Sequence, residues 1–192
     1  MPRRGVRTSI TVGSGYDFRA MGKVVSTTGE RMPQDFAHVP PSEGRSLWVF
    51  GELVTYKTTG QRTGGAYSLF EVASRLGIGP PPHVQHREEE AFWVLEGEYE
   101  FLIEGLTLTA SPGALIYVPK GTLHTHKNLG EDVSRMLVTQ TPGGLSEKFF
   151  EETGLPGTGL SSGSSVPTPE ELQRMVELGR NYGIEYPPPT VG

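Results

Sequence analysis

The chain has 192 residues, a formal net charge of −5 and no cysteine, which excludes disulfides, thiolate metal sites and cysteine nucleophiles. Its Lys and Arg residues form no cluster with interleaved aromatic residues, so the charge pattern argues against a nucleic-acid partner. With 35% hydrophobic and 20% charged residues it has the composition of one compact domain, and 26 Gly with 16 Pro favour a turn-rich, all-β sandwich or barrel.

Residues 1–46 are expected to form an N-terminal arm. The first five residues are followed by polar residues rather than by an apolar segment, so we expect no signal peptide, no membrane span and a cytoplasmic protein. The arm ends in the loop-like stretch 40–44 and has too few apolar residues for a core of its own. It should therefore pack on a barrel edge, either its own or that of a second copy, which favours a homodimer.

Residues 47–142 are expected to form the β-barrel. β-prone runs separated by turn residues predict strands from 47–55 and 66–74 onward to 133–139. Gly97 lies between two apolar or alternating runs and predicts a hairpin turn.

Residues 143–192 are expected to form a C-terminal helical extension. Residues 145–152 have helical character, and a Gly/Ser linker follows them. Thr168 as N-cap and Glu171 at the capping-box position predict a second helix that ends near Gly183. Its apolar stripe should pack on the exterior of the barrel.

Four of the five histidines fall in two tight clusters, at 83–86 and 124–126, and the first is followed by three glutamates at 88–90. Imidazole and carboxylate groups at such spacings indicate a metal site. Residues two apart in a strand point to the same face, so His83 and Gln85 project together, as do His124 and His126. Two such pairs that face each other across a barrel would converge on one cation.

The sequence around these clusters resembles the two motifs of the cupin superfamily. The first motif is His, any residue, His, any four, Glu, any six, Gly; His83, Glu90 and Gly97 match it, and Gln85 stands where its second His belongs. The second motif is Gly, any five, Pro, any residue, Gly, any two, His, any three, Asn. Every fixed position of it is matched, by Gly113, Pro119, Gly121, His124 and Asn128. Over roughly residues 47–150 the chain is most similar to single-domain cupins such as the bacterial quercetin dioxygenase-like proteins.

The resemblance implies an all-β cupin double-stranded β-helix, or jelly-roll barrel, that holds one divalent metal ion. His83, Glu90 and His124 carry over as metal ligands. Glu90, if loosely coordinated, would also accept a substrate proton as general base. The ion could be Fe, Ni, Mn, Zn or Cu, because imidazole and carboxylate suit all of them. The implied activity is dioxygenation of a small phenolic or enolisable substrate. The alternatives are a non-catalytic small-molecule-binding cupin and a metal-assisted isomerase or cyclase, since fold alone does not choose among functions.

Gln85 leaves the fourth ligand open. Its carboxamide oxygen could complete the metal site as a neutral, weaker donor than imidazole. Alternatively, His126 could supply an imidazole to the metal or to the substrate. Because His126 lies about 7 Å along the strand from His124, we expect it in the pocket or behind the ligands rather than on the metal.

The remaining candidates have plainer interpretations. No second histidine lies near His38 in the sequence. His86 should point away from the cavity, and Arg135 is expected on an exposed strand face. Glu88 and Glu89 are expected on a solvated rim. We expect most of the barrel's aromatic side chains to form the core, with one or two lining the pocket: Phe92, Trp93, Tyr99, Phe101 and Tyr117.

Overall fold

The structure is a computed structural model that describes residues 37–41, 43–160 and 166–188. Every element described below lies within residues 38–192. Most of the expected arm, residues 1–46, therefore lies outside the described residues. No helix of the described part combines the length and the apolar character needed to cross a membrane.

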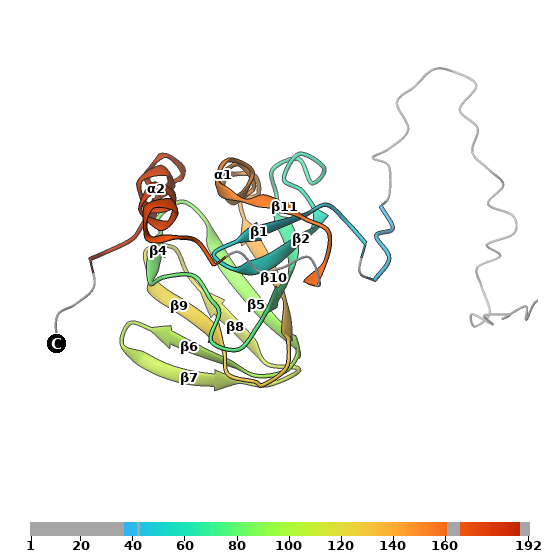
Figure 1. Cartoon of the computed structure of the whole chain (residues 1–192). Helices are drawn as coiled ribbons and strands as arrows, with labels where there is room; N and C mark the ends of the chain where they lie inside the picture. The colour runs from blue at the N-terminus through green and yellow to red at the C-terminus, as the bar shows by residue number, and fades with distance from the viewer. Residues whose placement is uncertain (1–36, 42, 161–165, 189–192) are drawn as a thin grey trace, which may run out of the picture. The chain divides into compact units, whose positions relative to one another are not determined.

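Two antiparallel sheets form the barrel predicted from the turn-rich composition (Figure 1). The seven-stranded sheet has the order β11-β1-β2-β3-β10-β5-β8. Its strands are β1 (Ser46–Val49), β2 (Glu52–Thr58), β3 (Ser68–Ser74), β5 (Glu89–Glu96), β8 (Leu115–Val118), β10 (Ser134–Thr141) and β11 (Leu155–Gly157). The five-stranded sheet has the order β12-β4-β9-β6-β7. Its strands are β4 (His83–Gln85), β6 (Tyr99–Ile103), β7 (Leu106–Ala110), β9 (Leu123–Asn128) and β12 (Ile184–Glu185).

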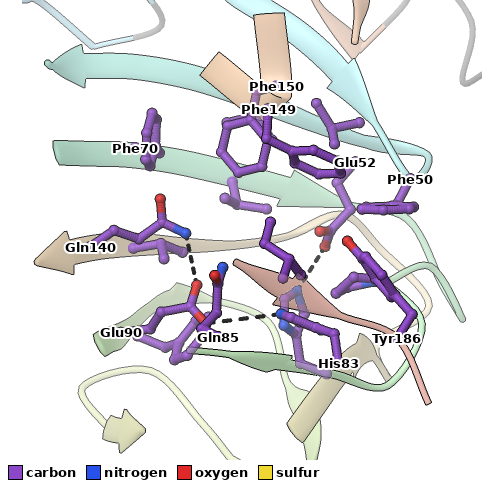
Figure 2. Close-up of a pocket in the computed structure, with 18 residues that line it drawn as sticks. Phe50, Glu52, Phe70, His83, Gln85, Glu90, Gln140, Phe149, Phe150 and Tyr186 are labelled. Carbon is purple, nitrogen blue, oxygen red and sulfur yellow. Dashed lines mark hydrogen bonds and ion pairs between the residues drawn. The ribbon is translucent and has the colours of Figure 1, made fainter. Parts of the chain in front are cut away.

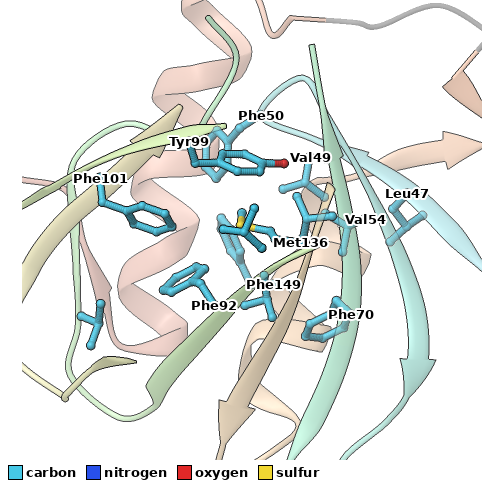
Figure 3. Packing of buried hydrophobic residues seen from close by; sticks show 14 of the residues in the cluster. Leu47, Val49, Phe50, Val54, Phe70, Phe92, Tyr99, Phe101, Met136 and Phe149 are labelled. Atoms are coloured by element: carbon cyan, nitrogen blue, oxygen red, sulfur yellow. The ribbon is translucent and has the colours of Figure 1, made fainter. Parts of the chain in front are cut away.

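The core lies between the two sheets and is rich in aromatic residues (Figure 3). Strand β10 alternates strictly between buried and half-buried residues, as expected of a strand with one face on a core. Phe92, Tyr99 and Phe101 are buried as expected, and Phe92 packs edge-on to Phe101 with ring centroids 5.3 Å apart. The same alternation that buries these rings also turns polar side chains of β2, β4, β5, β9 and β10 toward the interior.

Two of the aromatic residues expected in the core lie on the surface instead. Trp93 is 50% exposed and Tyr117 is 56% exposed. Strand β5 buries Phe92 and Val94, so Trp93 between them must face outward. Tyr117 pairs with Ala91 of the same outward face, and its hydroxyl donates to Glu89.

Close approaches of neighbouring atoms explain two of the glycines. Gly97, in the turn between β5 and β6 that the sequence predicts, has a φ of 74°, and a Cβ there would lie 1.9 Å from Ser134 Oγ. At Gly79 a Cβ would lie 1.8 Å from the backbone oxygen of His126. A side chain at Gly79 would therefore push the chain away from β9, which carries two of the site histidines.

The C-terminal part contains the two predicted helices. Helix α1 (Leu145–Thr153) buries Phe149 in the core, and α2 (Pro169–Gly179) begins with the predicted capping box of Thr168 and Glu171. Met175 of α2 packs on the core cluster, and the 3₁₀ turn η2 (Arg180–Tyr182) ends at Gly183. The sequence did not predict the return of the chain to both sheets. Strand β11 joins β1, and β12 joins the edge of β4, the strand that carries His83 and Gln85.

Asn128 of the second motif has a structural role. Its amide nitrogen donates to the backbone oxygens of Ser74 and Asp132, and its oxygen accepts from Gly130 N and Ser134 Oγ. Asn128 thereby ties the end of β9 to β3 and to the start of β10, which fixes the strand that presents His124.

Candidate metal centre

Three strands bring His83, Glu90 and His124 together inside the barrel. Figure 2 shows His83 and Glu90 of this group. His83 on β4 pairs directly with His124 on β9, and their ring centroids are 4.4 Å apart. Glu90 comes from β5 of the other sheet. One potential ligand atom of each residue lies within 4.8 Å of the other two, and all three side chains are buried.

Backbone hydrogen bonds orient both imidazoles toward the carboxylate. The Nδ1 atoms of His83 and His124 each lie 3.0 Å from a backbone oxygen, of Pro81 and Thr122 respectively. A carbonyl oxygen only accepts, so each Nδ1 carries the hydrogen and each Nε2 faces Glu90. Glu90 Oε2 lies 2.7 Å from His124 Nε2 and 3.9 Å from His83 Nε2. This use of the outer ring nitrogen is the arrangement that orients histidine ligands in metal sites.

The three groups shift one another's protonation. Burial, followed by the charge of His124, lowers the pKa of His83 to about 4. Burial alone would raise the pKa of Glu90, but the hydrogen bond and charge of His124, the charge of His83 and a hydrogen bond from Gln140 lower it to about 2. For His124, burial acts to lower the pKa, and the hydrogen bond and charge of Glu90 outweigh it, so the pKa is raised. The cluster therefore contains an ionised carboxylate with at least one imidazole that readily stays neutral, as a metal ligand must.

Gln85 lies on the same buried face of β4 as His83, as the spacing predicts. Its Nε2 donates to Ser146 Oγ at 3.5 Å, while its Oε1 is buried without a hydrogen-bond partner. Burial of an amide oxygen without a hydrogen-bond partner costs free energy. A cation or ligand that contacted this oxygen would remove that cost. The donor set of two imidazoles, one carboxylate and one unpartnered amide oxygen fits a divalent metal ion.

Glu88 is buried, which contradicts its expected place on a solvated rim. Only 1% of the residue is exposed, and its carboxylate accepts hydrogen bonds from Leu145 N, Ser146 N and Ser146 Oγ at the start of α1. Gly144, the N-cap residue of α1, has no side chain to serve this role. Through Ser146, Glu88 also supports the amide of Gln85.

His126 lies in the cavity beside the three-residue group rather than within it. Its Nε2 lies 3.1 Å from Glu52 Oε1, and its ring is surrounded by Phe92, Tyr99 and Phe101 at centroid distances of 5.6 to 5.9 Å. His86 is exposed and forms a 2.8 Å ion pair with Glu185, so it points away from the cavity as expected. His38 is exposed, and half-buried Arg135 pairs with Glu71 and Glu96.

Three cavity residues were absent from the sequence-based candidates. Glu52 on β2 pairs with His126, and Gln140 on β10 donates from Nε2 to Glu90 Oε1 at 2.8 Å. Tyr186, just after β12, places its ring 5.7 Å from that of His83 and 5.9 Å from Phe50, at the edge of the cavity (Figure 2). Glu52 and Gln140 are polar residues at strand positions where the alternation of side chains predicts burial. That signal could have identified these two residues from the sequence.

Comparison with known proteins agrees with this architecture. Residues 75–140 match the family model of the cupin domain. The chain is 26% identical to quercetin 2,3-dioxygenase of Bacillus subtilis (strain 168), over 61% of this chain and 34% of that protein. It is 29% identical to the rhicadhesin receptor of Pisum sativum, over 56% of this chain and 55% of the receptor. The chain thus spans about a third to about half of the length of these curated relatives.

A solved structure shows the same fold. The crystal structure of a predicted oxalate decarboxylase from Thermotoga maritima superposes with a TM-score of 0.51 at 18% identity, over 55% of this chain and 99% of that one. The family match spans both motifs and the strands that carry His83, Glu90 and His124, and the fold agrees with it. Residues 75–140 therefore match a cupin domain, and the described part of the chain has the cupin fold.

Proposed function

We propose that the chain is a metal-dependent cupin that holds one divalent ion, with His83, Glu90 and His124 as ligands and Gln85 Oε1 as a weaker fourth donor. The observation that carries the proposal is the convergence of two oriented Nε2 atoms and one ionised carboxylate inside a buried cavity. A buried cluster of this kind is stable when its charges are paired or coordinated. The ion is Fe, Ni, Mn, Zn or Cu, since all of them accept this donor set.

We propose further that the reaction is dioxygenation of a small phenolic or enolisable compound. The support is the similarity of the chain to quercetin 2,3-dioxygenase, at 26% identity over 61% of this chain. The bound metal would act as a Lewis acid that lowers the pKa of a substrate hydroxyl. Glu90 would accept that proton at Oε2, while the hydrogen bond from Gln140 would hold Oε1 in position. Phe92 and Phe149 line the cavity and would exclude water from a bound substrate.

The Gln at position 85 favours one competing function. An amide oxygen binds these metals less tightly than imidazole, so a non-catalytic cupin that binds a small molecule would tolerate it. A metal-assisted isomerase or cyclase would keep the same ligands and use no oxygen.

Oxygen consumption distinguishes these functions. Purified protein, loaded separately with each candidate metal, would be tested with a panel of phenols and enolisable ketones in an oxygen electrode. The proposal predicts uptake that depends on both metal and substrate, that is lost in His124→Ala and that is retained in His86→Ala. Turnover of a substrate without oxygen uptake would indicate the isomerase or cyclase, and binding without turnover would indicate the binding protein.

A further inference from the structure

The described residues contain three buried side-chain polar atoms without a hydrogen-bond partner, and all three belong to residues that line one cavity. They are Gln85 Oε1, Gln140 Oε1 and His126 Nδ1. Each of the three residues is at most 7% exposed. Because buried polar groups are nearly always paired, three unpaired ones around one cavity indicate that something else pairs with them there.

The hydrogen bonds of the two amide nitrogens identify Gln85 Oε1 and Gln140 Oε1 as the amide oxygens, which are acceptors. Gln140 Nε2 donates to the carboxylate of Glu90, which only accepts, so Oε1 is the free end of that amide. The Ser146 hydroxyl gives its hydrogen to Glu88, so Ser146 Oγ accepts from Gln85 Nε2. Neither amide can be reversed without placing two acceptors against each other.

The same reasoning applies to His126. Its Nε2 faces the carboxylate of Glu52, which also accepts from Ser74 Oγ, so Nε2 carries the ring hydrogen. In the neutral ring the other nitrogen, Nδ1, then presents a lone pair. The cavity therefore offers three acceptors that need donors from a ligand.

The charges around the cavity point to a neutral ligand. Among its described lining residues none is Lys or Arg, and two, Glu52 and Glu90, are buried carboxylates. In the metal-free protein, a ligand carboxylate or phosphate would meet these negative charges without a Lys or Arg side chain to pair with, in surroundings that screen poorly. The remaining walls are mainly apolar, and the cavity volume is about 60 Å³.

We propose that this cavity selects a small, neutral substrate with at least two hydroxyl groups, and that Gln140 Oε1 and His126 Nδ1 accept hydrogen bonds from those hydroxyls. The inference names the substrate class for the proposed function and rests on it only for the location of the ligand. Gln140 and His126 are then specificity-determining residues, whereas His83, Glu90 and His124 hold the metal. Gln85 Oε1 is left for the metal, as proposed above.

Matched ring compounds test the proposal by equilibrium binding. Isothermal titration of the full-length, metal-free protein would compare catechol with two donors, guaiacol with one, and benzoate as an anion. Wild type should bind catechol about tenfold more tightly than guaiacol, as expected from one hydrogen bond. Benzoate should bind at least tenfold more weakly than catechol.

Two variants and one control assign the preference to residues. Gln140→Met and His126→Phe keep the volume and the aromatic packing but remove an acceptor, so each should bring the ratio of catechol to guaiacol affinity close to one. Gln173→Met makes the same substitution as Gln140→Met on an exposed surface of α2 and should leave the ratio unchanged. The ratio is informative even if Gln140→Met shifts Glu90, because such a shift affects both compounds. Circular dichroism would verify that each variant is folded.

Several results would overturn the inference: no measurable catechol binding, equal affinity for catechol and guaiacol, tighter binding of benzoate, or an unchanged ratio in both cavity variants. A parallel zinc titration separates this inference from the proposed function. A protein that prefers catechol but binds no zinc would retain the donor-selective cavity and lose the metal-dependent activity. A protein that binds zinc but shows no preference for catechol would retain the metal-dependent activity and lose the donor-selective cavity.

Discussion

Removal of the Glu88 carboxylate should destabilise the protein more than any change at its neighbour Glu89. Glu88→Ala leaves Leu145 N, Ser146 N and Ser146 Oγ without their acceptor at the first turn of α1. Hydrogen bonds to a charged acceptor contribute roughly 1.5–3 kcal/mol each, and loss of a helix N-cap costs about 1 kcal/mol. Burial raises the pKa of Glu88, so the cost of burying its charge offsets part of that contribution at neutral pH.

We therefore expect a net loss of about 2–3 kcal/mol in the free energy of unfolding, or a fall of roughly 5–10 °C in Tm for a chain of this size. Urea unfolding followed by circular dichroism measures the change. The control is Glu89→Ala, which removes only the surface hydrogen bond from Tyr117 and should unfold close to wild type. If Glu88→Ala and Glu89→Ala unfold at the same urea concentration, Glu88 does not cap α1 and the reasoning is refuted.

Four further predictions concern the metal site and the oligomeric state. Gln85→His should raise zinc affinity in a competition titration, because imidazole replaces a neutral amide. His86→Ala should leave zinc affinity unchanged, and loss of zinc in that variant would contradict the orientation of β4. His124→Ala should abolish zinc binding, and retention of stoichiometric zinc would remove it as a ligand. The folded-state pKa of His83 is about 4, below its usual 6.5, so the folded protein holds this ring in its neutral form at neutral pH. The free energy of unfolding of the metal-free protein should therefore fall by up to about 3 kcal/mol as the pH falls from 6.5 to 4. If the urea midpoint of His83→Asn shows the same pH dependence as wild type, this prediction is refuted. If the N-terminal arm packs on the barrel edge of a second copy, light scattering should find a dimer and removal of residues 1–37 should weaken it; a monomer with unchanged stability after removal would end that proposal.

The local pattern of the sequence predicts the parts of the site that lie on single strands. The two-residue spacing within β4 and β9 is enough to place His83 with Gln85 and His124 with His126 on inward faces, because side chains alternate in any strand. The first motif adds Glu90. The capping box of Thr168 and Glu171 and the turn at Gly97 are equally local, and both are present.

The errors and omissions arise where tertiary packing decides. Trp93 and Tyr117 were expected inside on residue type alone, but the phase of β5 puts Phe92 inward and so turns Trp93 outward. Glu88 was expected at the surface as a charged residue, yet α1 begins directly over it. Gln140 and Glu52 come from strands far away in the sequence, and only the pairing of β10 with β5 brings Gln140 to Glu90.

The number of metal ions bound per chain tests the proposed site most directly. Elemental analysis of protein purified without a histidine tag, followed by titration of the chelator-treated protein with zinc, measures the number of ions per chain. We predict about one divalent ion per chain in the wild type, with His124→Ala empty and His86→Ala like wild type. A wild-type chain that is isolated without metal and takes up none on titration would contradict the assignment of His83, Glu90 and His124 as metal ligands.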